Sequence, residues 1–412
     1  MTGRAHRDRG VAVVVPLALA LLGLGGTAAY RAPHPAVPLH AEAVAVLADG
    51  SRRAVGVGEQ PGWVAGTRAL DPEQAAAQLA WLANGTVPGG AAYADLARTA
   101  LLDLRTLTID GAPVAGWSPA WRYVWPRDAA FVAVAYARTG HLGDARAALS
   151  FLHRVQAADG SFHARYLPDG SGPPDGRGLQ EDGPAWALWA LAEVAEVSPG
   201  VAREFATLRD RSAERLVARA GLPPASSDYW ERRETRLTLG VAAPALAGLD
   251  AAAYLYDVVG DQGRRAWATA AADRTAQAVQ AAFGPHYPRE VGGRQVDAAV
   301  TFLLPPFQRR TLAGAAAAVR RAEPLLRRPA GGLAPGEGWR SDGVSWTPET
   351  ALFALTAAAT GDHASARHWL DWLAAHRTAA GALPEKVGHD GRPGAVAPLA
   401  WTAALVVLTL TS

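Results

Sequence analysis

The chain has 412 residues, of which half are apolar and 19% are charged, which is the composition of a folded globular body with a large core. The formal net charge is only +2, and the 39 Arg and one Lys are scattered rather than gathered with aromatic residues into a stripe. A nucleic-acid partner is therefore not expected. The absence of Cys excludes disulfides, thiolate catalysis and metal sites with Cys ligands.

The first thirty residues have the charge pattern of a targeting segment. Arg4, Arg7 and Arg9 precede an uncharged run over residues 11–30, and residues 27–29 offer a small-x-small cleavage site. The run is also long enough to span a bilayer as an uncleaved anchor. A buried N-terminal helix is the third possibility. Either of the first two predicts an extracytoplasmic body, secreted or anchored to the cell membrane by residues 1–30.

Residues 31–71 contain several Pro and Gly and little periodicity, which predicts a linker to a domain over 72–412. In that domain, Ala366, Trp369, Leu370 and Leu373 follow the i, i+3, i+4, i+7 spacing of one helix face. Breaks at Gly and Pro divide the domain into about twelve helices. Their expected ranges are 89–106, 126–139, 143–157, 179–196, 199–219, 229–259, 262–283, 296–304, 309–327, 346–360, 363–378 and 396–411.

The sequence repeats itself at a shift of 221 residues, so that Gly140, Ala145 and Leu149 correspond to Gly361, Ala366 and Leu370. Repeated helical hairpins close as an open solenoid or as a ring. Twelve helices suit six hairpins in an all-α (α/α)6 toroid, and the long polar loops favour a ring with a functional mouth.

Five loop segments concentrate aromatic residues, Arg and carboxylates, whereas the helices are mostly Ala and Leu. Such a mixture describes a carbohydrate site, because Asp and Arg bind pairs of hydroxyls and indole rings pack on the apolar faces of sugars. Glycoside cleavage needs two carboxyl groups, one protonated and one ionised. The segments are Trp121–Asp128, Gln180–Gly183, Asp228–Glu231, Trp339–Gly343 and Leu383–Lys386.

At these positions the chain resembles glycoside hydrolase family 15, the glucoamylase-like enzymes. The resemblance covers about residues 92–412, through Tyr-Val-Trp-Pro-Arg-Asp at 123–128, Gln-x-Asp-Gly at 180–183, Asp-x-Trp-Glu at 228–231, Pro-Glu at 384–385 and Pro-Leu-Ala-Trp at 398–401. It implies an (α/α)6 barrel that releases glucose from non-reducing chain ends with inversion. It also implies that Glu231 is the general acid and Glu385 the general base. The substrate-binding residues it implies are Arg127, Asp128, Trp125, Tyr123, Gln180, Asp182, Asp228, Trp230 and Arg340.

Structural interpretations of the same residues remain possible beside these functional ones. Glu231 could be an exposed carboxylate at a helix start, Asp182 and Asp228 could cap helices, and Trp121, Trp346 and Trp401 are expected in the core. No His pair has metal-ligand spacing, so neither a metal nor another cofactor is expected.

The chain also departs from the family pattern. Arg232 follows Glu231 where many relatives have an acid, and residues 31–88 are too short for the N-terminal β-sandwich of bacterial relatives. These departures support the alternative of a catalytically silent, envelope-tethered glycan-binding toroid. A lyase or epimerase of the same fold is a third hypothesis, which the lack of a His-rich loop disfavours. Glucan, glucodextran and trehalose all remain open as substrates.

Overall fold

The structure is a computed structural model that describes residues 36–412. The predicted targeting segment over residues 1–30, and the first residues of the predicted linker, lie outside the described residues.

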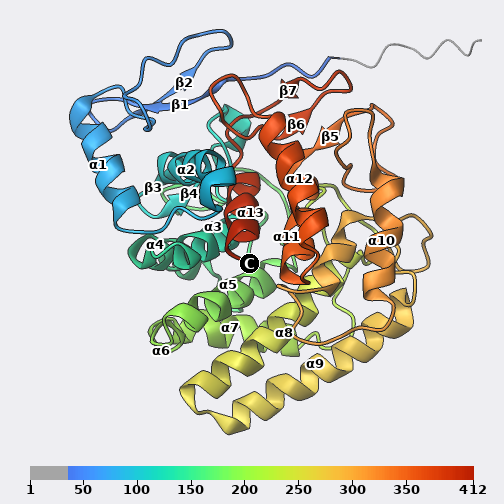
Figure 1. Cartoon of the computed structure of the whole chain (residues 1–412). Helices are drawn as coiled ribbons and strands as arrows, with labels where there is room; N and C mark the ends of the chain where they lie inside the picture. The colour runs from blue at the N-terminus through green and yellow to red at the C-terminus, as the bar shows by residue number, and fades with distance from the viewer. Residues whose placement is uncertain (1–35) are drawn as a thin grey trace, which may run out of the picture. The chain divides into compact units, whose positions relative to one another are not determined.

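Six helical elements form an inner ring, and each packs against the next (Figure 1). Because the last element also packs against the first, the repeat closes as a toroid and not as an open solenoid. This confirms the predicted (α/α)6 architecture. In ring order the elements are α3 (Pro126–Arg138), α5 (Gly183–Val197), α8 (Leu239–Val259), the 3-10 helix η2 (Ala298–Leu303), α11 (Thr347–Ala359) and α13 (Ala400–Thr411).

An outer helix packs behind each inner element. Five of the outer helices follow their inner partners along the chain, whereas the sixth, α2, comes before all of the inner helices and packs on α13. The two ends of the body therefore meet and close the ring. The outer helices are α2 (Gly90–Leu107), α4 (Leu142–Val155), α7 (Ala206–Val217), α9 (Gln262–Phe283), α10 (Ala315–Leu326) and α12 (His363–Ala375).

The internal repeat corresponds to two hairpins of this ring. A shift of 221 residues carries α3 onto α11 and α4 onto α12, with the same first and nearly the same last residues. Almost every residue of α3 and α11 is buried, whereas α4 and α12 are buried on one face only. A helix buried all round can be apolar all round, which explains why the Ala- and Leu-rich inner helices lack a polar face.

Several expected helices differ from the observed ones. The helix expected over 229–259 begins only at Leu239, the one over 296–304 is the short 3-10 helix η2, and the one over 199–219 is split into α6 (Val201–Glu204) and α7. The helix α1 (Pro72–Ala83) was not predicted, although Asp71 caps it by accepting from the backbone N–H groups of Glu73 and Gln74. The helix α8 is long and apolar enough to cross a membrane, but most of it is buried inside the body.

The linker expected over 31–71 is wrong for residues 36–71. Strands β1 (Ala43–Val46) and β2 (Arg52–Val55) pair as an antiparallel hairpin. Buried residues of the hairpin pack against Ala382 and Ala397 of the body. Arg68 forms a buried ion pair with Asp103 of α2, with a distance of 2.6 Å between Nε and Oδ1. This segment is therefore an integral part of the folded unit.

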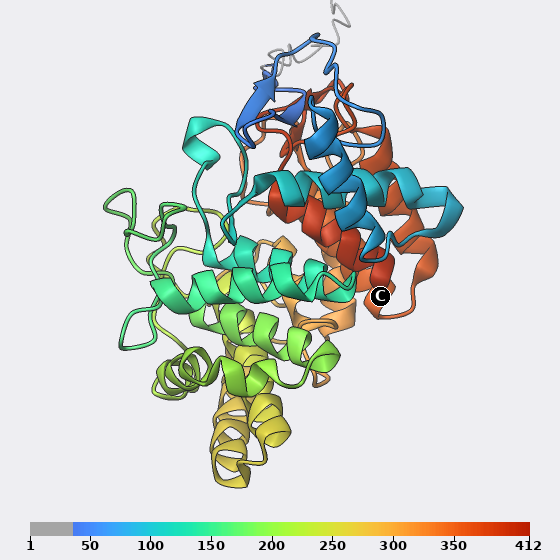
Figure 2. The same cartoon turned by 90° about the vertical axis from the view of Figure 1, so that its left-hand side faces the viewer.

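Short strands connect the helices where the chain enters the mouth of the ring. Strands β3 (Thr108–Ile109) and β4 (Ala112–Pro113) pair with each other, and β5 (Ser345–Trp346), β6 (Lys386–Val387) and β7 (Pro393–Gly394) form a three-stranded sheet. A 3-10 turn, η1 (Pro119–Trp121), precedes α3. Figure 2 shows long loops projecting on the side of the body away from the C-terminus.

Candidate active site

A cavity of about 340 Å³ opens where the inner elements begin. Its walls come from the first turns of α3, α11 and α13 and from the loops that precede α5, α8 and α11. The loops at one end of the toroid thus converge on a single hollow, as the sequence predicts. The charged residues that line it are Arg127, Asp128, Arg165, Arg177, Glu231, Glu349, Glu385 and Lys386.

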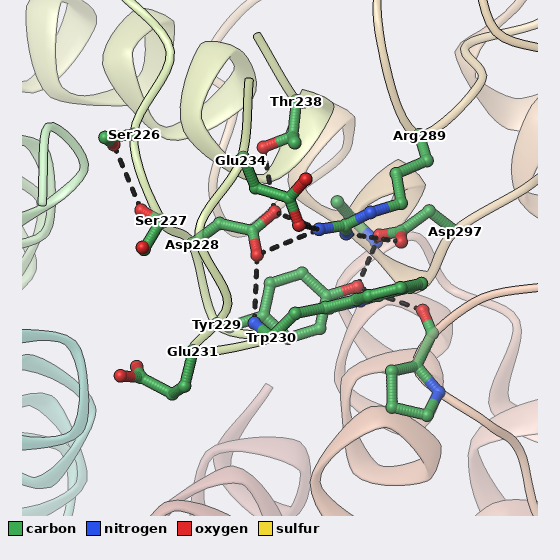
Figure 3. Close-up of polar contacts among 12 residues, drawn as sticks. Ser226, Ser227, Asp228, Tyr229, Trp230, Glu231, Glu234, Thr238, Arg289 and Asp297 are labelled. Atoms are coloured by element: carbon green, nitrogen blue, oxygen red, sulfur yellow. Dashed lines mark hydrogen bonds and ion pairs between the residues drawn. The ribbon is translucent and has the colours of Figure 1, made fainter. Parts of the chain in front are cut away.

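Glu231 lies in a tight turn that a buried carboxylate holds in place. Asp228 is fully buried, and it accepts hydrogen bonds from the backbone N–H of Trp230 at 2.9 Å and from the hydroxyl of Thr238 at 2.8 Å. The backbone N–H of Glu231 donates to the Asp228 carbonyl at 2.8 Å, and Glu231 has a left-handed φ of 54°. The turn directs the Glu231 carboxylate away from Asp228, as Figure 3 shows.

Arg289 links this turn to the neighbouring loops through ion pairs. Its guanidinium contacts Asp228 at 3.1 Å, Glu234 at 2.7 Å and Asp297 at 2.8 Å, and it lies 3.4 Å from the ring centroid of Trp230 (Figure 3). The side chains of Asp228 and Asp297 have no solvent exposure. Buried carboxylates need a cation and hydrogen bonds, and Arg289 supplies both to this cluster.

Three side chains surround the Glu231 carboxylate. Its Oε2 atom lies 2.9 Å from Nη1 of Arg177, and its Oε1 atom accepts from the Gln180 amide at 3.2 Å and lies 3.6 Å from Nη1 of Arg127. The Glu231 side chain is 23% exposed. Arg232, the departure noted in the sequence, instead lies over the Trp230 and Trp339 rings and lines a separate surface pocket.

Glu385 reaches the same cavity from the position directly before β6, the central strand of the three-stranded sheet. Its backbone N–H donates to Val396 at 2.8 Å, and its carbonyl accepts from the backbone N–H of Thr347 at the start of α11. The indole of Trp121 donates to its Oε1 atom at 3.3 Å, and the ammonium of Lys386 lies 3.3 Å from its Oε2 atom. The two glutamates, 231 and 385, are therefore brought to one hollow, as predicted.

Arg127 and Asp128 occupy the first turn of α3, at the base of the cavity. Their side chains are 7% and 5% exposed and lie 3.1 Å apart. The Nε and Nη1 atoms of Arg127 make no hydrogen bond among the described residues, and its guanidinium stacks 4.5 Å from the ring centroid of Trp401. Burial raises the pKa of the Asp128 carboxyl to about 6, in spite of the Arg127 charge.

Five of the predicted substrate-binding residues do not line the cavity. Tyr123 packs against the guanidinium of Arg165, and the amide of Gln180 donates to Glu231. Asp182 accepts from the indole of Trp186, and burial raises the pKa of the Asp182 carboxyl to about 7. Asp228 holds the turn described above, and Arg340 is exposed outside the cavity.

The predicted Trp125 and Trp230 do line the cavity, together with residues that the sequence analysis missed or assigned elsewhere. Trp121, Trp346 and Trp401, which were expected in the core, stand in its wall. Arg165, Arg177 and Glu349 were not singled out, and Trp339 was named only as part of the loop segment Trp339–Gly343. Arg177 and Glu349 belong to no recognised motif. Only the internal repeat, in which Glu349 corresponds to Asp128, could have indicated Glu349 as a site residue. No cluster of metal-ligating side chains occurs within residues 36–412.

The chain was compared with family models, with curated proteins and with solved structures, and only the solved structures are similar to it. No family model matches the chain, and no curated protein is similar to it in sequence. Among solved structures it is similar to a glycosidase variant in complex with glucose, with a TM-score of 0.66, 20% identity and coverage of 82% of this chain and 98% of that one.

Two glucoamylases are similar as well. A bacterial glucoamylase complexed with acarbose has a TM-score of 0.66 and 18% identity, with 81% of this chain and 57% of that one covered. The glucoamylase of Saccharomycopsis fibuligera has a TM-score of 0.58 and 13% identity, with 82% and 93% covered. The chain has a glucoamylase-like fold. The resemblance to glycoside hydrolase family 15 noted in the sequence is thus confirmed at the level of the fold.

Proposed function

We propose that the protein is a glycoside hydrolase that releases glucose from the non-reducing ends of α-glucosides with inversion of the anomeric carbon. The observation that carries this proposal is the presence of Glu231 and Glu385, from distant parts of the chain, in the wall of one cavity. The neighbouring Arg127 and Asp128 and the tryptophan-rich wall supply the hydroxyl-binding and apolar surfaces that a sugar needs.

In this mechanism Glu231 protonates the departing glycosidic oxygen while Glu385 deprotonates the water that attacks the opposite face of the sugar. Glu385 accepts a hydrogen bond from the Trp121 indole and lies 3.3 Å from the Lys386 ammonium, and this donor and this positive charge stabilise its carboxylate as the base. Arg177, the partner of Glu231, is 40% exposed, so the substrate can displace this side chain when it approaches Glu231.

Arg127 and Asp128 would orient the terminal sugar. Both are buried at the start of a helix that is itself buried on all sides, so their positions are set by the core rather than by a loop. Such positioning lowers the barrier by holding the anomeric carbon between the acid and the water. A pocket of this size, closed below by the inner helices, suits attack at a chain end.

The test compares the full-length chain with its Glu231→Gln and Glu385→Gln variants on maltooligosaccharides, glucodextran and trehalose. Each substitution is expected to lower kcat by about 10²- to 10⁴-fold, because a positioned acid or base contributes that factor. Glu73→Gln, which changes an exposed glutamate of α1, is the matched control. NMR should detect β-glucose as the first product from the longer maltooligosaccharides and from glucodextran, and equal amounts of α- and β-glucose from trehalose. Turnover that is insensitive to both active-site changes, or α-glucose as the first product from the longer maltooligosaccharides or glucodextran, would refute the proposal.

The second candidate is a glycan-binding toroid without catalysis. It is favoured by the ion pairs that hold both glutamates, with Arg177 at 2.9 Å from Glu231 and Lys386 at 3.3 Å from Glu385. The same substrate panel separates the two candidates. Calorimetric binding of maltooligosaccharides without any release of glucose would establish the binding function and exclude the hydrolase.

Export is the remaining part of the proposal, and it rests on the sequence of residues 1–30. Three arginines before an uncharged run direct the body to the outside of the cell membrane, where a polysaccharide substrate would be met. Cell fractionation with antibodies against the body tests this. Recovery of the full-length chain in the cytoplasm would contradict it.

A further inference from the structure

The internal repeat places a further carboxyl group in the cavity, at the position equivalent to Asp128. The 221-residue shift that carries α3 onto α11 carries Asp128 onto Glu349, and each is the third residue of its helix. Both helices pack against α13, which lies between them in the ring. Both residues line the cavity. The repeat therefore builds two equivalent positions on either side of the α13 start, and each carries an acid.

Glu349 differs from the other acids of the cavity in having no cation beside it. Asp128 lies 3.1 Å from Arg127, Glu231 lies 2.9 Å from Arg177, and Glu385 lies 3.3 Å from Lys386. Glu349 is only 2% exposed, its Oε2 atom has no hydrogen-bond partner, and among residues 36–412 it forms no ion pair. A charged carboxylate in this position would be strongly destabilising.

The surroundings of Glu349 favour its neutral form. Burial raises the pKa of the Glu349 carboxyl to about 8, although a hydrogen bond from its own backbone N–H lowers it, and the nearby Glu385 raises the pKa further than the charge of Arg127 lowers it. Asp297 and the buried phenol of Tyr229 are the other titratable groups that face it. At neutral pH Glu349 therefore carries an O–H group, which can donate a hydrogen bond as no ionised acid can.

We propose that Glu349 is a sugar-binding residue that donates a hydrogen bond from its neutral carboxyl group to a hydroxyl oxygen of the glucose unit in the cavity. The inference rests on the proposed function for its ligand class. It assigns complementary roles to the two repeat-related acids, because Asp128 is paired with a cation and accepts hydrogen bonds, whereas Glu349 donates one.

The experiment is a cycle of protein variants and ligand analogues. The binding of glucose and of 2-, 3-, 4- and 6-deoxyglucose is measured by calorimetry on the full-length wild type, Glu349→Gln and Glu349→Leu. Loss of the contacted hydroxyl should weaken binding to the wild type by about 10- to 100-fold, because it leaves a buried donor unpaired. The Gln variant, which keeps a neutral donor, should retain this discrimination, and the Leu variant should lose it for that one analogue.

A matched control uses the same helix. Thr356→Val replaces another buried polar side chain of α11 that has no hydrogen-bond partner and does not line the cavity, and it should leave the discrimination unchanged. If the Leu variant does not fold, the pH dependence decides. Wild-type affinity for glucose should fall as the pH rises through about 8, whereas the Gln variant should bind equally at pH 7 and pH 9.

Each outcome bears on one claim. Equal discrimination by the wild type and the Leu variant, or loss of it in the Gln variant, overturns the role of Glu349, whether or not the protein hydrolyses maltose. Coupling between Glu349 and one hydroxyl without any hydrolysis supports this inference and overturns the hydrolase. Absence of glucose binding overturns the role of Glu349, whereas the hydrolase is decided by glucose release from the substrate panel.

Discussion

Replacement of Arg289 by Met should destabilise the protein and displace its proposed general acid. Arg289 is the cation shared by Asp228 and Asp297, two carboxylates without solvent exposure, and by Glu234. Removing one partner of a buried ion pair costs about 3–5 kcal/mol, because the remaining charge is left uncompensated. Methionine keeps the contact with Trp230 but supplies neither the charge nor the donors.

The expected change in melting temperature follows from the size of the unit. The unfolding entropy of a body over residues 36–412 is roughly 0.8 kcal/mol per kelvin, so 3–5 kcal/mol lowers the Tm by about 4–6 °C. The turn over residues 228–231 loses its anchor as well. A displacement of about 1 Å at Glu231 would lower kcat by about 10²-fold.

Differential scanning calorimetry and glucose-release assays at saturating substrate measure the two effects. Arg289→Lys should restore part of the stability, because it returns the charge without the planar fork that binds three carboxylates. Addition of Asp297→Asn to Arg289→Met should also raise the Tm by removing one unpaired charge. A Tm within 1 °C of the wild type, together with unchanged kcat, would refute the view that this cluster positions Glu231.

Three further predictions concern other parts of the body. Arg68→Met should lower the unfolding free energy by about 3–5 kcal/mol, because Asp103 is left buried without its cation. Urea titrations measure this loss. The kcat of the folded enzyme should stay unchanged. The pKa of Asp182 is raised to about 7, so its contribution to stability is fully present below about pH 4 and is progressively lost up to pH 7. This pH dependence of the unfolding free energy should be absent in Asp182→Asn. Equal slopes of unfolding free energy against pH in the two proteins would contradict the prediction. Gly248→Ala should cost about 1–3 kcal/mol, because its Cβ would lie 2.6 Å from the backbone of α5. Gly263→Ala, whose Cβ would make only an ordinary contact at 3.6 Å with Asp261, should be neutral in the same thermal scans.

Much of the ring could be predicted from sequence, because its signals are local. Helix periodicity and Gly breaks located α3, α9 and α11 to within about two residues, and the 221-residue repeat indicated equivalent hairpins before any contact was known. Twelve helices suited six hairpins, and the long polar loops favoured a closed ring over an open solenoid. These features depend on neighbours along the chain, which a sequence displays directly.

The hairpin over residues 36–71 and the start of α8 could not be predicted in the same way. The strands of the hairpin are four residues long and are stabilised by contacts with Ala382 and Ala397, more than 300 positions away. Neither the apolar pattern nor the charge pattern of residues 229–238 indicates that they are irregular rather than helical. What keeps them irregular is the Asp228–Arg289 pair, which joins residues 61 positions apart.

In the candidate site, too, the predictions that depended on neighbours along the chain were the more successful ones. Trp125, Arg127 and Asp128 adjoin one another in the sequence, so the motif indicated them together, and the structure brings all three to the cavity. The family resemblance implied Arg340, but its loop places Trp339 in the cavity wall and leaves Arg340 exposed. A loop segment shows which residues are available, whereas its backbone path decides which of them face the ligand.

Glu231 shows why that backbone path matters for function. Its φ of 54° is a conformation that costs a non-glycine residue about 1–3 kcal/mol, so the turn persists only because surrounding contacts over-determine it. Asp228 supplies those contacts through the N–H of Trp230 and the hydroxyl of Thr238, and Arg289 holds Asp228 in turn. The result is a carboxylate directed away from its own supporting cluster and into a separate hollow. The sequence Asp-x-Trp-Glu therefore works as a unit, in which the first residue fixes the geometry and the last presents the reacting group.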